Sequence, residues 1–379
     1  MGNMRLLIPG PVEAEDSVLD ALSAQTIPHY GPVFMALFHD TTEKLQRLFE
    51  TKGDVIMVPG PGTAAIDAAV GSLIMPGSSA VVVNNGFFGT RLAQITRAYG
   101  VHVHELRAPW GQPVLASDLR ALLKDVQPKA ERDGAPVHAL VLVHHETSTG
   151  VLNPLEELAS AGREHGLAVI VDAVASWGGV RIPVDAWGID ACISVGNKCL
   201  GAPPGVAVAA ISERAWQMAA ENPAPHGWYL NLKTWRYYMD EWDWHPYPTT
   251  MPTNNIAALN RALGNVFDKG VDEFRVGFTA AAERARAGLG RLGFTLFPEP
   301  GYAAPVISAM NGQPGVDLND MLRYLRDERG YMLGGGIADL HGKIFRVGHM
   351  GLARMPEVVD GLIEATADYL SERAPIGTD

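Results

Sequence analysis

Short apolar runs alternate with helix-forming segments through the middle of this chain, and this alternation limits its possible folds more than any other feature. Several runs are apolar at every position, which is typical of strands buried on both faces of a sheet. The expected strands are 80–83, 101–104, 139–143, 167–171, 191–194 and 206–211, with helices at 63–74, 88–99 and 155–165. Strands alternating with helices predict an α/β fold, in which helices cover a mostly parallel sheet.

The pattern changes after residue 254, where a long helical stretch precedes shorter elements. Short strands are expected there at 294–297, 304–309, 331–333 and 343–347, with helices at 318–328 and 356–370. We therefore predict a large α/β domain over residues 15–254 and a smaller α+β domain over 255–379, which residues 1–14 would complete.

Residues 226–250 are unusually aromatic and include Trp228, Trp235, Trp242 and Trp244. One interpretation is a core helix whose tyrosine hydroxyls reach water. The other is a subunit interface that also forms a wall of a substrate pocket, because aromatic residues are enriched at interfaces. The sequence favours neither interpretation over the other.

Composition excludes several classes of function. The formal charge of −12 argues against binding to nucleic acids or anionic membrane surfaces. Apolar stretches are shorter than the roughly 20 residues that a membrane span requires. Cys192 and Cys199 are the two cysteines, too few for a disulfide framework and wrongly spaced for a CxxC zinc motif. We expect a cytoplasmic protein that binds neither nucleic acid nor membrane.

The pair Asp172 and Lys198 carries the strongest indication of chemistry. Asp172 follows the apolar run 167–171, where a carboxylate beside a buried sheet needs a cationic partner. Lys198 lies in a nearly uncharged, turn-rich segment, and burial would favour its nucleophilic free amine. Each residue alone has an ordinary interpretation, as a helix cap for the aspartate and a solvated side chain for the lysine. Together they suggest pyridoxal phosphate chemistry, with the carboxylate on the pyridine nitrogen and the lysine as a Schiff base.

Three other strand ends carry residues that suit a phosphorylated, planar cofactor. Gly62, Thr63 and Ala64 open a helix after an apolar strand, where backbone amides favour an anion. Phe88 could stack on a ring, although a core phenylalanine is an equal alternative. Ser148 follows another strand and could bond a cofactor oxygen.

A metal site is not predicted at His144-His145-Glu146. Consecutive residues on a strand point to opposite faces and cannot converge on one ion. Arg346 lies between apolar neighbours and could clamp a substrate carboxylate, with a structural salt bridge as the alternative.

In this order, these residues resemble the class V aminotransferases, in particular the alanine–glyoxylate and serine–glyoxylate (serine–pyruvate) enzymes. The resemblance spans essentially the whole chain and is carried by residues 9–11, 59–63, 85–89, 147–150, 171–176, 197–198, 202–205 and 346–348. It implies a homodimer of fold type I that uses pyridoxal 5'-phosphate, with active sites at the subunit interface.

The resemblance also implies roles for individual residues. Lys198 and Asp172 would be catalytic. The cofactor would contact Gly62, Thr63, Ala64, Phe88, Ser148, Asp172, Val174, Asn197, Lys198, Tyr247 and Thr250. Of these, Tyr247 and Thr250 would reach the phosphate of the neighbouring subunit. The substrate would contact Arg346, Ser148 and Tyr30.

The implied activity is a ping-pong transfer of an amino group from alanine or serine to glyoxylate or pyruvate. One alternative is a pyridoxamine–pyruvate transaminase, which shares stretches near Tyr30, Lys198 and Arg346 with this chain. Pro61 and Ile337 speak against it, because they stand where that enzyme has a glutamate and a second arginine. A pyridoxal-phosphate lyase or desulfurase on the same fold is the other alternative.

Overall fold

The computed structural model describes residues 4–224 and 226–373 of the chain. Its large sheet has seven strands in the order β2-β10-β9-β8-β5-β3-β4. These strands are β2 (Asp54–Pro59), β3 (Ser79–Asn84), β4 (His102–Arg107), β5 (Val137–Val143), β8 (Ala168–Asp172), β9 (Ala191–Val195) and β10 (Val206–Ile211). Strand β10 is antiparallel to both of its neighbours, and the other pairings are parallel. The predicted α/β fold with a mostly parallel sheet is therefore confirmed.

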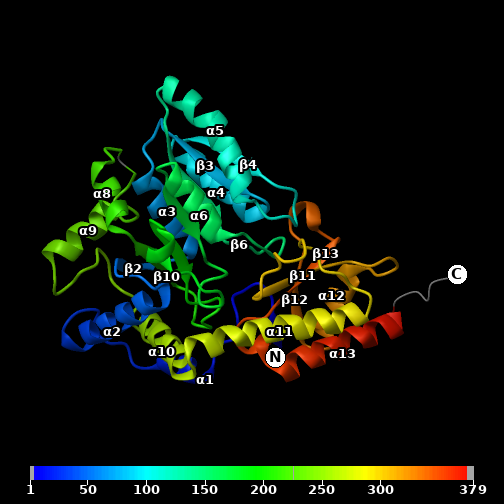
Figure 1. Ribbon diagram of the computed structural model, residues 1–379. Helices are drawn as coiled ribbons and strands as arrows, with labels where there is room; N and C mark the ends of the chain where they lie inside the picture. The colour runs from blue at the N-terminus through cyan, green and yellow to red at the C-terminus, as the bar shows by residue number, and fades with distance from the viewer. Residues whose placement is uncertain (1–3, 225, 374–379) are drawn as a thin grey trace.

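Helices α3 (Gly62–Leu73), α4 (Phe87–Ala98), α5 (Ala116–Arg132) and α6 (Leu155–Glu164) pack against the strands of this sheet (Figure 1). Helix α7 (Val184–Trp187) packs against α6, whereas α8 (Glu213–Glu221) and α9 (Leu232–Glu241) pack against α3 and against each other. Strands β3, β9 and β10 are buried at every position, which explains why their sequences do not alternate. The carboxyl ends of the parallel strands lie at one edge of the sheet, where α/β proteins bind ligands.

A second sheet has four strands in the order β1-β12-β13-β11. The strands are β1 (Arg5–Leu7), β11 (Ile307–Asn311), β12 (Tyr331–Gly335) and β13 (Ile344–Gly348). Helices α11 (Val271–Arg291), α12 (Leu318–Asp327) and α13 (Pro356–Arg373) pack around it, with α11 and α13 side by side in Figure 1. Strand β1 pairs with β12, so the start of the chain joins a sheet built from its end.

The remaining elements connect these two regions. They are α1 (Asp16–Ser23), α2 (Pro32–Phe49), α10 (Thr253–Lys269) and the short strands β6 (His145–Glu146) and β7 (Val151–Leu152), with 3-10 turns at Ala338–Leu340 and Gly351–Arg354. Ile256 and Leu259 of α10 belong to the same hydrophobic cluster as the large sheet. The domain boundary at residue 254 stays a prediction.

One expected strand is absent. Residues 294–297 form no strand in this structure; Leu296 makes only an isolated bridge to Met310. Pro298 and Pro300 follow at once, and proline cannot donate a hydrogen bond to a ladder. The neighbouring strand also begins later than expected, at Ile307, after Pro305.

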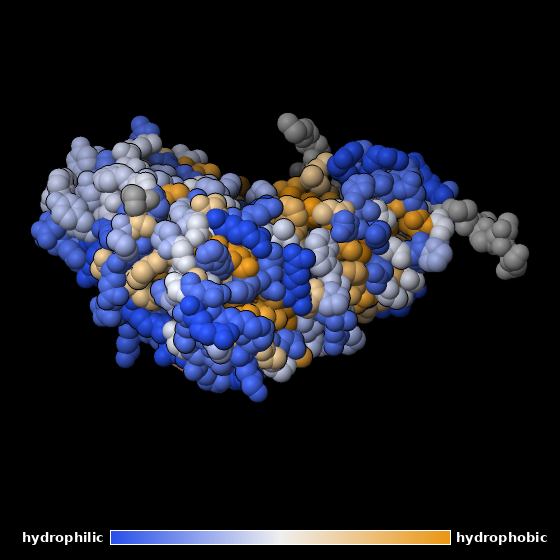
Figure 2. Space-filling view, turned by 90° about the horizontal axis from the view of Figure 1, so that it is seen from above, coloured by the Kyte–Doolittle hydropathy of each residue, from blue (hydrophilic) through white to orange (hydrophobic). Residues whose placement is uncertain are grey.

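The surface is mostly hydrophilic, but hydrophobic residues gather toward the middle of the face in Figure 2. Among the large aromatic side chains, Tyr30, Trp228, Tyr237 and Trp244 are each more than half exposed. Within residues 4–224 and 226–373, no helix combines the length and apolar character needed to cross a bilayer.

Candidate active site

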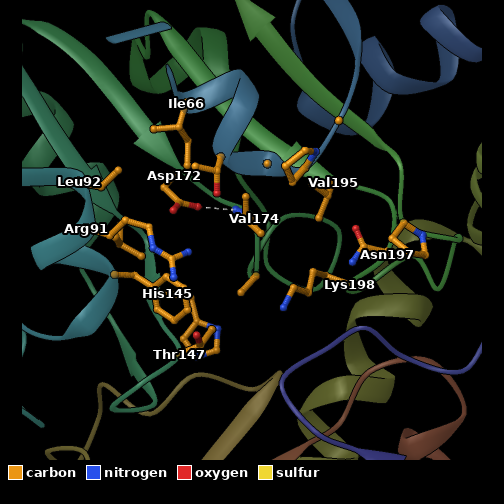
Figure 3. A pocket seen from close by; sticks show the side chains of 18 of the residues that line it. Ile66, Arg91, Leu92, His145, Thr147, Asp172, Val174, Val195, Asn197 and Lys198 are labelled. Carbon is orange, nitrogen blue, oxygen red and sulfur yellow. Dashed lines mark hydrogen bonds between the residues drawn. The ribbon is translucent and has the colours of Figure 1, made fainter. Parts of the chain in front are cut away.

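A cavity of about 510 Å³ lies at the carboxyl edge of the large sheet (Figure 3). Seven of the residues predicted from the sequence line it: Gly62, Thr63, Phe88, Asp172, Val174, Asn197 and Lys198. They come from the ends of β8 and β9 and from the first turns of α3 and α4. The fold thus brings together residues that are up to 136 positions apart in the sequence, from Gly62 to Lys198.

Lys198 lies in the turn that follows β9, and its side chain enters the cavity (Figure 3). Its amine donates a hydrogen bond to the carbonyl of Pro9, in the segment after β1. Gly10 packs so closely that a Cβ there would lie 2.7 Å from Lys198 Cδ. Burial lowers the pKa of the Lys198 amine, which favours the uncharged, nucleophilic form.

Asp172 is the last residue of β8 and faces the same cavity. Its Oδ1 accepts a hydrogen bond of 3.0 Å from the backbone N–H of Val174, shown by the dashed line in Figure 3. Burial raises the pKa of the carboxyl to about 6, against opposing effects from that hydrogen bond and from the charges of Lys198 and Arg91. The carboxylate therefore needs a cationic partner that the cavity has room to hold.

The first turn of α3 forms another part of the cavity wall. Gly62 is required there, because a Cβ would lie 2.6 Å from Val174 Cγ2 and 3.2 Å from Val195 Cγ1. Thr63 is exposed to the cavity, whereas Ala64 is not part of the lining. The Ala64 amide also donates to the Pro61 carbonyl at 2.9 Å, so it serves the turn itself.

Phe88 and Ser148 are near each other, but only Phe88 lines the cavity. The Phe88 side chain lines the cavity from the first turn of α4. Ser148 is fully buried outside the lining, where its hydroxyl donates to Glu146 Oε1 at 2.5 Å and accepts from the Phe87 N–H at 3.0 Å. Its predicted contact with a cofactor or substrate stays a prediction.

Glu146 fixes the start of α4. Its Oε2 accepts hydrogen bonds from the N–H groups of Phe88 and Gly89, at 3.0 and 2.9 Å. Burial raises the pKa of this carboxyl, although hydrogen bonds from Ser148 and Gly89 oppose the rise. A carboxylate at a helix N-terminus is stabilising, and here it also orients Phe88.

Arg346 lies on β13 of the second sheet and reaches the edge of the site. Its Nε donates to the Gly335 carbonyl at 3.0 Å and its Nη1 to the Thr147 carbonyl at 3.1 Å. Thr147 itself lines the cavity. Burial lowers the pKa of the guanidinium to about 10, and the charge of Glu146 opposes this. Arg346 forms no ion pair among the described residues, contrary to the structural salt bridge considered as its alternative role.

Besides Ala64, Ser148 and Arg346, three further predicted residues lie outside the lining of the cavity. Tyr30 is 54% exposed, and Thr250 is exposed as well. Tyr247 is fully buried and its hydroxyl donates to the His29 carbonyl, while burial raises its pKa to about 12. Their predicted contacts with cofactor, substrate or a neighbouring subunit stay predictions.

Sequence reasoning missed three polar residues of the cavity lining, Arg91, His145 and Thr147. Arg91 lies one helical turn after Phe88, with its guanidinium 4.8 Å from the centre of that ring. The helical spacing alone could have identified it, since residues i and i+3 share a face. His145 was considered only as a metal ligand, and no group of three or more candidate ligands occurs within the described residues.

Lys198 and Asp172 share one cavity of an α/β fold. Comparison with known proteins identifies the class of enzyme. The chain belongs to the family described as Aminotransferase class-V, which it matches over residues 13–347, and it is an aminotransferase. The resemblance stated from the sequence is thereby confirmed.

Individual relatives differ in the reactions for which they are named. The chain is 33% identical to an uncharacterized aminotransferase of Methanocaldococcus jannaschii, over 93% of this chain and 89% of the other. It is 28% identical to a pyridoxamine–pyruvate transaminase of Mesorhizobium japonicum, over 92% and 87%. The crystal structure of an alanine–glyoxylate aminotransferase from Nostoc sp. superposes with a TM-score of 0.91 at 33% identity, over 98% and 96%.

Enzymes of this family depend on pyridoxal phosphate, and the residues present fit that group. The raised pKa of Asp172 marks a carboxylate without a sufficient counter-charge, which a pyridinium nitrogen would supply. Lys198 offers an amine in the same cavity, and the close packing at Gly62 brings the first amides of α3 to its wall.

Proposed function

We propose that this chain binds pyridoxal 5'-phosphate and transfers an amino group from alanine or serine to glyoxylate or pyruvate. The observation that carries the proposal is the pair Lys198 and Asp172, which enter one cavity from the ends of neighbouring strands. The order would be ping-pong, with the first keto acid leaving before the second binds.

Each residue has a role that follows from its position. Asp172 would hold a proton on the pyridine nitrogen, while Gly62 and Thr63 would receive the phosphate at the start of α3. Phe88 and Val174 would give the ring apolar contacts. When bound, the cofactor supplies an electron sink for charge that develops on the substrate's α-carbon. Lys198 would remove the proton from that carbon and deliver it again, because burial keeps its amine basic but uncharged.

The substrate preference rests on the distribution of positive charge. Arg346 uses Nε and Nη1 on backbone carbonyls, which leaves Nη2 for a substrate carboxylate. Arg91 lies on the Asp172 side of the cavity (Figure 3), and its positive charge lowers the pKa of the Asp172 carboxyl. Arg346 is the arginine whose charge acts on Lys198, and one such cation would favour small monocarboxylic substrates over dicarboxylic ones.

The test is a half-reaction followed by visible absorbance. Protein loaded with pyridoxal phosphate should be mixed in turn with alanine, serine and pyridoxamine, and bleaching by alanine or serine is expected. Glyoxylate or pyruvate should then restore the band. Lys198→Ala should abolish the bleaching, whereas Lys124→Ala, a change at an exposed lysine on α5, should not.

The same experiment separates the alternatives. Bleaching by pyridoxamine alone would indicate the pyridoxamine–pyruvate reaction, for which the relative from Mesorhizobium japonicum is named. Pro61, on the cavity wall, brings no charge for such a donor. A desulfurase needs an accessible cysteine; Cys192 and Cys199 are both buried, and burial raises the pKa of the Cys199 thiol to about 12.

We also infer that two copies of the chain associate. Trp228 and Trp244 are exposed aromatic residues in the segment 226–250, while Trp235 of the same segment is buried. Exposed aromatic side chains are enriched at interfaces, so Trp228 and Trp244 support the interpretation of this segment as a subunit interface. Sedimentation of the purified protein tests the dimer: a monomer at micromolar concentration would contradict it. The cytoplasmic location stays a prediction.

A further inference from the structure

Residues 8–10, which follow β1, lie against both the second sheet and Lys198, and we call them the N-terminal strap. The carbonyl of Pro9 accepts a hydrogen bond from the Lys198 amine, 189 positions away in the sequence. Gly10 packs on the same side chain, because a Cβ there would lie 2.7 Å from both Cδ and Nζ of Lys198. Gly10 also has a φ of +104°, which favours glycine. The strap therefore contacts Lys198 through its backbone.

Glycines of the second sheet contact the strap as well. A Cβ at Gly334 of β12 would lie 2.8 Å from Pro9 Cδ and 3.4 Å from Pro9 Cγ. A Cβ at Gly348 of β13 would meet the Ile8 carbonyl. A side chain at either position would displace the strap. The strap is therefore tightly packed between the second sheet and Lys198.

The same contacts connect Lys198 to Arg346. Gly334 pairs with Arg346 between β12 and β13, and a Cβ at Gly334 would lie 3.5 Å from Arg346 Nη2. Pro9 thus lies between the strand pair that carries Arg346 and the amine of Lys198. The charge of Arg346 also acts on that amine. One short segment therefore holds the proposed base in place relative to the proposed carboxylate clamp.

We propose that the Pro9 carbonyl orients the free amine of Lys198 and that Gly334 is a positioning residue, because it fixes Pro9. The inference rests on the proposed function, in which Lys198 moves the proton at the substrate's α-carbon. A neutral amine has two N–H donors and one lone pair. A hydrogen bond to Pro9 therefore restricts the directions in which the lone pair can point, and a catalytic group held in one orientation reacts faster.

The titration of the Lys198 amine reports on this hydrogen bond. Burial lowers the pKa of Lys198. Cys199 and Asp172 oppose the effect of burial, and Arg346 adds to it. A carbonyl acceptor stabilises the ammonium more than the neutral amine, because hydrogen bonds to charged groups are stronger. A weaker hydrogen bond to Pro9 should therefore lower the pKa of Lys198 further.

The test is a pH profile of Lys198 acetylation in the full-length protein freed of cofactor. Acetic anhydride reacts with the uncharged amine, and mass spectrometry of the digested protein gives the midpoint of the profile. Gly334→Ala should displace Pro9 and lower the midpoint of Lys198 by about 0.5–1 pH unit. Adding Pro9→Ala removes Cγ and Cδ, the atoms that the new Cβ would meet, and should restore most of the midpoint.

Two controls match these variants. Gly290→Ala makes the same change at an exposed position of α11, where a Cβ meets no atom within 4 Å, and should leave the midpoint in place. Lys124, exposed on α5, is the internal reference and should titrate alike in every variant. Pro9→Gly loosens the strap without adding a contact and should also lower the midpoint. It replaces Gly334→Ala if that protein does not fold.

The outcomes separate this inference from the function on which it rests. A wild-type midpoint in Gly334→Ala, or in its replacement, would overturn the proposal. A shift that persists after Pro9→Ala is added would assign the effect to Arg346, whose contact with the new Cβ remains, and would overturn it too. The proposed function fails separately, if wild-type protein forms no visible band with pyridoxal phosphate, and acetylation of Lys198 still reports on the strap in that case.

Discussion

Replacing Asp172 by asparagine should make the cofactor-free protein more stable at neutral pH while weakening its cofactor binding. The wild-type carboxyl has a pKa of about 6, raised from 3.8 mainly by burial, so its ionised form is disfavoured in the folded state. Asparagine has nearly the same shape and keeps an oxygen for the Val174 N–H, at 3.0 Å in the wild type. The variant thus removes a buried charge and preserves the hydrogen bond.

The magnitude follows from proton linkage. A folded-state pKa of about 6 in place of 3.8 corresponds to at most about 3 kcal/mol of lost stability above pH 6. The side chain is partly open to the cavity, and we therefore expect about 1–2 kcal/mol. The folded state binds the extra proton between pH 3.8 and about 6, so wild-type stability falls as pH rises through that window. The advantage of asparagine should vanish toward the acid end.

Urea unfolding of both cofactor-free proteins across this window provides the measurement. Asp243→Asn, at an exposed aspartate after α9, is the matched control. With pyridoxal phosphate present the order should reverse, because the pyridinium supplies the missing positive charge. An Asp172→Asn protein no more stable than the wild type at neutral pH would refute the reasoning.

Further variants test individual contacts. Gly62→Ala should destabilise the fold by about 1–3 kcal/mol in thermal unfolding, and adding Val174→Ala should recover part of it, since the new Cβ meets that side chain at 2.6 Å. Phe88→Leu should weaken pyridoxal phosphate binding about 3- to 10-fold in a fluorescence titration; unchanged affinity would exclude stacking. Glu146→Gln should cost about 1–3 kcal/mol of stability, because one pair of donors loses its acceptor, and an unaltered melting temperature would contradict this. Arg346→Lys should raise KM for alanine about 10- to 100-fold with the cofactor band unchanged; an unaltered KM would remove its role as the carboxylate clamp.

The fold could be predicted from the sequence where the spacing of apolar residues matched the burial of the element. Strands such as β3 and β10 are buried on both faces, so their continuous apolar runs identified them directly. The stretch 294–297 misled because its apolar residues pack against the second sheet without forming a ladder; Phe294 contacts Phe345 edge to face. A run of apolar residues indicates burial. A strand also requires a neighbouring strand whose backbone N–H and C=O groups are free to pair with it.

The site was readable only in part, for a related reason. Lys198 and Asp172 stand out because they are charged residues in apolar surroundings, and the structure brings both to one cavity. Arg91 and Thr147 lie in ordinary polar stretches, and only the packing of α4 and the loop after β6 carries them to the wall. No local pattern distinguishes Thr147 from solvent-exposed residues, whereas Arg91 could have been identified by its spacing of three residues from Phe88.

The alternation that excluded a metal site at His145-Glu146 also explains what these two residues do. Consecutive strand residues point to opposite sides, so β6 sends His145 to the cavity and Glu146 to the start of α4. Glu146 also accepts a hydrogen bond from the hydroxyl of Ser148. Exchanging the two residues would therefore place a carboxylate against the cavity and leave the N–H groups of Phe88 and Gly89 without their acceptor. The order of the dipeptide, and not its composition, assigns the two roles.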